Sequence, residues 1–202
     1  MIQGLQINIK DISLEEKKLR QESLNLFKEK GFPNKRLEEW KFTDLNKIID
    51  NNFKDLKTNN QITKDLKIEE FKDFQHNSII LIDGTLKSYN FKYEDKTKIE
   101  IKNYSKGLIK KFKTKNPLIN LNDALYAGGY YLEILENYDL KKPLIIYNYF
   151  SNNLKNEIVN NKNLIILNNN CGIEIVEFNT DVSKNNFIQN NYTNIEIGEN
   201  ST

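Results

Sequence analysis

Short strand-like segments recur along the chain after Gly129. Of all the features of the sequence, this one places the strongest limit on the fold of the chain. The segments are apolar or alternating, and asparagine, glycine or charged residues separate them: YYLEIL, PLIIYNYF, NLIILN, GIEIVEF and TNIEIG. No helical pattern lies between them. Recurring short strands of this kind are typical of a sandwich, a barrel or a solenoid of stacked strands. Periodicity alone does not choose among the three.

The earlier part of the chain is mixed. Residues 13–30 begin with a capping-box pattern, Ser13 with Glu16, and place Leu19, Ser23, Leu26 and Phe27 on one face of a predicted amphipathic helix. Thr43 is the predicted N-cap of a second helix. Strands are predicted for NSIILIDG and KIEIK, and a short helix for LINLNDALYAGG. The pattern of predicted elements changes near Pro117, so we expect two structural units: a helical and mixed N-terminal domain, 1–116, and the recurring strands of 117–202.

Composition narrows the classes of function. With 30 Lys and Arg against 28 Asp and Glu, the net charge of +2 gives no field that would draw the 202-residue chain to nucleic acid or an anionic membrane. The chain begins without a basic region and apolar run typical of an export signal, and its longest apolar runs are too short to span a bilayer. One cysteine suits a reducing compartment. We therefore expect a soluble, cytoplasmic protein without nucleic-acid or membrane partners.

The only tryptophan lies in a charged stretch, GFPNKRLEEWKFTDL. Gly31 stands where a left-handed helix cap is expected, and Pro33 prevents the helix from continuing. Trp40 then falls between two predicted helices. We expect its indole to pack against both apolar faces, a structural role that we favour over a binding hot spot.

This stretch resembles a signature of the SufD family, which takes part in iron–sulfur cluster assembly by the SUF system. The signature reads Gly-x-Pro-x-x-(Arg/Lys)-x-Glu-x-Trp-(Lys/Arg)-(Tyr/Phe)-Thr, and the chain matches it at Gly31, Pro33, Arg36, Glu39, Trp40, Lys41, Phe42 and Thr43, with Glu38 as an alternative for the acidic position. Three later landmarks are also similar to the family: LIDG at 81–84, NLNDALYAGGYYLEI at 120–134, and the step Lys142-Pro143-Leu144.

The resemblance implies an α+β, mainly β fold, in which a small helical N-terminal domain precedes a right-handed parallel β-helix. It also implies a scaffold and not an enzyme: a subunit that pairs with SufB, binds the SufC ATPase and supports iron acquisition. The chain alone would bind no cofactor, and an iron–sulfur cluster would belong to the whole complex. Gly31, Pro33, Arg36, Glu39, Trp40 and Thr43 would form a structural or interaction motif.

Members of that family are longer than this chain, and the regions that meet SufB, dock the ATPase and supply a histidine near the assembly site are not found in it. We expect a truncated or shortened form whose last strands have an open edge. Unpaired backbone groups at such an edge favour association. The chain is therefore expected to self-associate through this edge, or to have the edge covered by another segment.

Other candidates carry less weight. Cys171 is interpreted as a buried turn or core residue because a cluster needs several thiolates. His76 is interpreted as a surface loop residue, and the basic run at 104–115 as a solvated helix face. The sequence contains no phosphate-binding loop motif, so any binding and hydrolysis of ATP would have to be carried out by a partner. A different class of function, a stand-alone β-solenoid module that binds a sugar or a protein, would be favoured by an exposed aromatic stripe such as Tyr147 and Tyr149.

Overall fold

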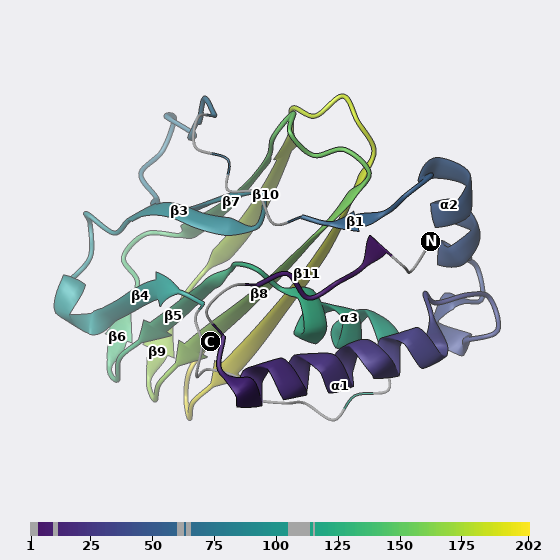
Figure 1. The fold of residues 1–202 in the computed structure, drawn as a ribbon. Helices are drawn as coiled ribbons and strands as arrows, with labels where there is room; N and C mark the ends of the chain where they lie inside the picture. Colours follow the sequence, from purple (N-terminus) through teal and green to yellow (C-terminus); the bar gives the residue numbers. More distant parts are fainter. Residues whose placement is uncertain (1–3, 10–11, 60–62, 64–65, 105–113, 115) are drawn as a thin grey trace.

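The structure, a computed structural model, describes residues 4–9, 12–59, 63, 66–104, 114 and 116–202. It is a mixed α/β fold, and the described part of the chain contains three α-helices and three sheets. The helices are α1 (Leu14–Lys30), α2 (Leu45–Asn52) and α3 (Pro117–Leu125), with 3-10 turns η2 (Glu38–Trp40) and η3 (Lys96–Lys98). Figure 1 shows α1 and α3 side by side along one side of the strands.

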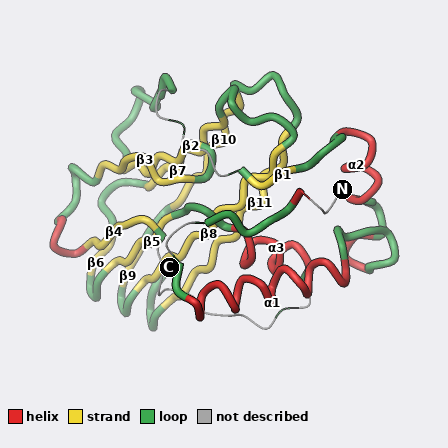
Figure 2. The backbone as a smooth tube through the Cα atoms, in the orientation of Figure 1, coloured by secondary structure: helices red, strands yellow, loops and turns green. Residues whose placement is uncertain are grey.

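The strands form two principal sheets. One has the order β10-β7-β2-β3, comprising Ile175–Asp181, Leu144–Phe150, Asn77–Ile82 and Thr85–Asn90. The other has the order β1-β8-β5-β4, comprising Lys57–Thr58, Glu157–Leu167, Tyr130–Ile134 and Ile99–Asn103, and β11 (Phe187–Ile197) also pairs with β8. A third, small sheet joins β6 (Tyr138–Asp139) to β9 (Cys171–Gly172). Figure 2 shows the strands in yellow, with α1 and α3 in red along one side of them.

Later strands repeat the path of earlier ones. β10 lies parallel to β7, β11 to β8 and β9 to β6, each in continuous register. Asparagine side chains bond between successive levels, with Asn190 30 residues after Asn160 and Asn170 33 residues after Asn137. The chain thus makes two successive passes through the same three sheets.

Apolar side chains from distant segments form the cores. Leu24 and Phe27 of α1 pack with Leu121 and Leu125 of α3 and with Ile158 of β8, so the helices cover the outer face of one sheet. A second core fills the space between the two sheets, with Ile79, Leu132, Leu144 and Ile165 among its members. A third lies on the outer face of the other sheet, around Tyr147 and Tyr149.

The predicted helix boundaries are largely confirmed. Ser13 caps α1 by accepting the N–H of Glu16 at 3.1 Å, and α1 ends at Lys30 with Gly31 as its C-cap. The φ of Gly31 is positive, at 68°, but its ψ of -166° differs from the predicted left-handed cap. The second N-cap, however, is Asp44 and not Thr43, because the Asp44 carboxylate accepts the N–H of Lys47 at 3.1 Å. The prediction for α2 was wrong by one residue.

The buried face of α1 also differs from the predicted one. Leu26 is exposed, whereas Glu16 and Arg20 are buried as an ion pair of 2.9 Å. Arg20 donates to the backbone oxygens of Ala124 and Tyr126, at 3.2 and 3.0 Å, and its guanidinium stacks on the Tyr126 ring. Arg20 therefore satisfies carbonyls at the end of α3, a need that the sequence of α1 does not reveal.

Strand pairing crosses the boundary expected between 1–116 and 117–202. β2 lies between β3 and β7, while β4 pairs with β5 and β1 with β8. Division of the chain into two units stays a prediction.

At the junction of α3 and β5, Gly129 has a φ of 130°, and a Cβ there would lie 1.8 Å from the backbone oxygen of Lys162. Only glycine allows this close approach.

Every helix in the described part falls short of the length and apolar character needed to cross a lipid bilayer.

Candidate interaction site

The loop from Gly31 to Thr43 is held at its base by a phenylalanine. Phe32 is 2% exposed and packs edge-to-face on Phe27 of α1, with ring centroids 5.0 Å apart. The backbone oxygen of Phe32 accepts the Asn46 side-chain amide at 2.7 Å, and the oxygen of Pro33 accepts the N–H of Leu45 at 3.0 Å. The start of the loop is thereby tied to both α1 and α2.

Successive turns then shape the loop itself. The side chain of Asn34 accepts the N–H of Arg36 at 3.0 Å, and its backbone oxygen accepts the N–H of Leu37 at 3.0 Å. The 3-10 turn η2 follows, and the oxygen of Trp40 accepts the N–H of Thr43 at 2.8 Å. These local bonds give the loop a defined conformation between two helices.

The loop points apolar side chains outward. Phe42 is 86% exposed and Leu37 is 45% exposed, while Trp40 is half-buried. Lys41 lies over the Phe42 ring at 5.2 Å and pairs with Glu38 at 3.3 Å. An exposed phenylalanine on an ordered loop is the kind of side chain that a protein partner buries.

The predicted motif residues are all in this loop, but they take different positions. Pro33 is buried, Gly31 and Trp40 are half-buried, and Arg36, Glu39 and Thr43 are exposed. Trp40 belongs to none of the core clusters of described residues, and Phe32 fills the corner expected for the indole. Sequence reasoning missed Phe32 as the anchor, although its place directly after the helix cap was a signal.

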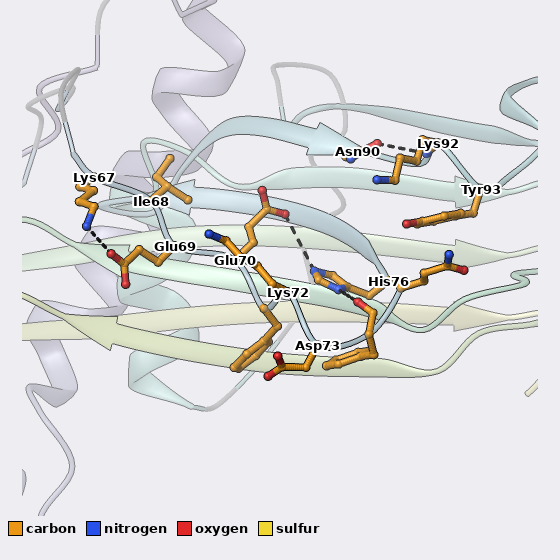
Figure 3. A pocket seen from close by; sticks show the side chains of 13 residues that line it. Lys67, Ile68, Glu69, Glu70, Lys72, Asp73, His76, Asn90, Lys92 and Tyr93 are labelled. Atoms are coloured by element: carbon orange, nitrogen blue, oxygen red, sulfur yellow. Dashed lines mark hydrogen bonds and ion pairs between the residues drawn. The ribbon is translucent and has the colours of Figure 1, made fainter.

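A cavity of about 950 Å³ lies on the outer face of the β10-β7-β2-β3 sheet (Figure 3). It is lined by residues 67–76 and by Asn90, Lys92 and Tyr93. His76 is one of the lining residues and lies in a loop, as predicted, but its side chain is only 8% exposed and so does not extend into solvent as expected for a surface residue. Its ring bonds to the Tyr147 hydroxyl at 2.9 Å and to the Phe74 backbone oxygen at 3.1 Å. The fold buries this side chain because Tyr147, far away in sequence, supplies its partner.

Tyr147 and Tyr149 share one face, as the alternation predicts, but they form no exposed stripe. Their rings stack 6.3 Å apart, and both side chains are buried beneath residues 66–76. The N–H groups of Phe71 and Glu69 each donate to a tyrosine hydroxyl at 3.0 Å. The feature that would favour a sugar-binding or stand-alone module is therefore absent from these two strand positions.

Cys171 is a buried free thiol, as predicted, within 3.2 Å of the Leu135 backbone oxygen. Among the residues that the structure describes, no three His, Cys, Asp or Glu side chains gather as a set of metal ligands. The basic run at 104–115 lies almost entirely outside the described residues, and its interpretation stays a prediction.

Glu94 is a buried carboxylate with many donors. Its oxygens accept the side-chain amide of Asn77 at 2.8 Å, the Tyr138 hydroxyl at 2.9 Å and the N–H groups of Lys141 and Lys142. Burial alone would raise the pKa of Glu94, but these hydrogen bonds outweigh it and hold the pKa below its ordinary value. Glu94 is a structural clamp on the Lys142-Pro143-Leu144 step.

The family model described as the SufBD protein N-terminal region matches residues 8–146. The chain belongs to the SufB/SufD family. The matched region runs from before α1 into β7, so it contains the whole Gly31–Thr43 loop and the Glu94 clamp. No curated protein matches the chain. Membership of the SufB/SufD family indicates involvement in SUF iron–sulfur cluster assembly, together with other subunits.

Proposed function

We propose that this chain is a non-catalytic, SufD-like scaffold subunit of the SUF complex. It supports iron–sulfur cluster assembly and iron acquisition together with a SufB-like protein and a SufC-like ATPase. The cluster is the cargo of the complex, and the chain alone holds no cofactor. The match of the SufBD model to residues 8–146 is the observation that carries this proposal.

The Gly31–Thr43 loop supports a role in binding other subunits. The conformation of the loop depends on Phe32 and on backbone hydrogen bonds. Leu37 and Phe42 are exposed and are not needed to hold it. We propose that these two side chains, with Trp40 and Arg36 beside them, contact another subunit of the complex. Aromatic and arginine side chains dominate the energetics of protein interfaces.

The strand arrangement supports a further part of the proposal. We propose that the two stacked passes are the first coils of a right-handed parallel β-helix, as in the SufD family. Parallel pairing in register over β7 with β10 and β8 with β11 favours this architecture. Asparagine ladders at levels 30 to 33 residues apart add side-chain hydrogen bonds between the coils.

Copurification tests the proposal. The chain would be mixed in reducing buffer with tagged SufB-type and SufC-type proteins from the same source, and its retention measured by gel densitometry. We expect retention of the parent chain and at least about tenfold weaker binding, equivalent to about 1.4 kcal/mol, for Phe42→Ala and for Trp40→Ala.

Leu14→Ala provides a matched control, since Leu14 is similarly exposed but begins α1, at the far end of that helix from the loop. This variant should be retained like the parent chain. Absence of binding by the parent chain to both proteins would contradict the scaffold proposal for these residues. Equal retention of all variants would show that binding does not use the loop.

A further inference from the structure

Residues 66–76, here called the strap, lie on the outer face of the β10-β7-β2-β3 sheet and lead directly into β2 (Figure 3). Two tyrosines of β7 hold the strap by its backbone. The Tyr149 hydroxyl bonds to both the N–H and the oxygen of Glu69, and the Tyr147 hydroxyl accepts the N–H of Phe71 at 3.0 Å. Tyr147 is fully buried, with the Phe71 ring 5.8 Å from its own, so its burial depends on this attachment.

His76 is the second partner of the Tyr147 hydroxyl. Its Nε2 lies 2.9 Å from the hydroxyl oxygen, and its Nδ1 lies 3.1 Å from the Phe74 backbone oxygen. A backbone oxygen only accepts hydrogen bonds, so Nδ1 carries a hydrogen, and in the neutral ring Nε2 accepts the Tyr147 O–H. The hydrogen bonds therefore run in one direction, from the N–H of Phe71 to the Tyr147 oxygen and from the Tyr147 O–H to His76.

A proton on His76 reverses the direction of the bond to Tyr147. Both ring nitrogens of a histidine cation are donors, so the Tyr147 oxygen has to accept from Nε2 and its own hydrogen has to turn away. A phenol hydrogen lies in the plane of the ring, in one of two positions. The position away from His76 brings it against the N–H of Phe71, and two donors that face each other form no hydrogen bond.

One carboxylate lies close enough to answer a charge on the His76 ring. It belongs to Glu70, whose Oε2 lies 4.0 Å from Nε2. A charged ring attracts this carboxylate, and because Glu70 directly precedes Phe71, a turn of Glu70 toward the ring also draws Phe71 away from Tyr147. The other charged or titratable groups that line the cavity come from the strap and from the segment after β3: Lys67, Glu69, Lys72, Asp73, Lys92 and Tyr93.

We propose that the protonation state of His76 controls the strap: the neutral ring keeps Phe71 attached to Tyr147, and the charged ring releases it. Glu69 stays attached in both states, because its partner is Tyr149. Release lifts the Phe71 ring and uncovers Tyr147 on the outer face of the sheet. The attachment is complete where the ring is neutral, and it is lost as the pH falls from about 8 to about 5, the range in which histidines change charge. This inference does not depend on the proposed SUF function.

Amide hydrogen exchange, followed by NMR, tests the switch in the intact chain. Protection factors of the Phe71 and Glu69 amides, corrected for the intrinsic effect of pH on exchange, would be compared at about pH 7.5 and about pH 5. We expect the Phe71 protection factor to fall at least about fivefold at the lower pH, and that of Glu69 to change by less than about twofold. His76 is the only histidine, so one ring C–H resonance reports its protonation, and the Phe71 amide resonance should shift with the same midpoint.

Two variants separate His76 from other groups that titrate. His76→Gln keeps a donor and an acceptor but takes up no proton, so its Phe71 protection should be equal at both pH values within about twofold. Tyr147→Phe removes the acceptor of the Phe71 N–H, so Phe71 protection should be low at both pH values.

The comparison of the two midpoints uses the parent chain, so it decides the question even if a variant fails to fold. Different midpoints for the His76 ring and the Phe71 amide would overturn the inference. So would Phe71 protection that does not change with pH, an equal fall in His76→Gln, or an equal fall at Glu69, which would indicate a general opening of the strap.

Discussion

Both carboxylate oxygens of Glu94 accept the backbone N–H of Lys141, at 3.1 and 3.0 Å. The pair ties the loop after β3 to the entry of β7, a central strand of its sheet. A carboxylate that serves several buried donors cannot be replaced by an amide without leaving donors opposed to the new N–H groups.

We therefore expect Glu94→Gln to lower the free energy of unfolding by about 1.5–3 kcal/mol at pH 7, measured by urea titration. The pKa of Glu94 is lower in the folded chain than in the unfolded one, so its contribution is complete above the unfolded pKa of about 4.3 and is lost as the pH falls through the folded value. The difference between parent and variant should accordingly shrink below about pH 4. A difference that is independent of pH would contradict this role.

Arg20 should contribute to stability at least as much as Glu94 does, because it holds α1 against α3. Arg20→Met leaves Glu16 buried without its partner and removes the donors to the Ala124 and Tyr126 oxygens, so we expect a loss of about 3–5 kcal/mol in chemical unfolding. Replacing Glu16 by Gln in the same chain should recover part of the loss, because the unpaired buried charge is then gone. No recovery would indicate that the backbone contacts of Arg20 carry the whole effect.

Phe32 and Phe42 lie in the same loop but should respond differently. Phe32→Ala removes a buried ring and should cost about 3–5 kcal/mol of stability. Phe42→Ala changes an exposed ring and should stay within about 0.5 kcal/mol. Thermal and urea unfolding of the two variants measure this split, and comparable destabilisation by both would mean that Phe42 packs in the folded chain.

Self-association through a strand edge stays a prediction. Among the described residues, β10 and β11 each have a strand partner on one edge, and β11 carries one charged residue, Glu196, within Phe187–Ile197. Sedimentation velocity of this chain should show oligomers that grow with concentration, and Asn194→Lys should shift them toward monomer, because edge lysines oppose strand addition. A sharp monomer peak at all concentrations would contradict the prediction.

Local signals in the sequence were sufficient for much of the fold. Ser13 and Gly31 bound α1 because a hydroxyl cap and a positive φ act within a few residues. The strands predicted at NSIILIDG, KIEIK and after Gly129 are present, and Asp83 and Gly84 form the predicted turn, both with positive φ. The resemblance at Gly31–Thr43 correctly indicated the SufB/SufD family.

Contacts between segments far apart in sequence decided the rest. Trp40, His76 and Tyr147 have local patterns that fit either the surface or the core, and their burial depends on what another part of the chain places over them. Phe32 occupies the corner that was expected for Trp40, residues 66–74 cover Tyr147, and the Tyr147 hydroxyl in turn binds the His76 ring. The sequence by itself determined where helices, strands and turns begin, because those are set by neighbouring residues. Only the tertiary structure decided which aromatic side chains are left for a partner, because burial is a property of the assembled layers.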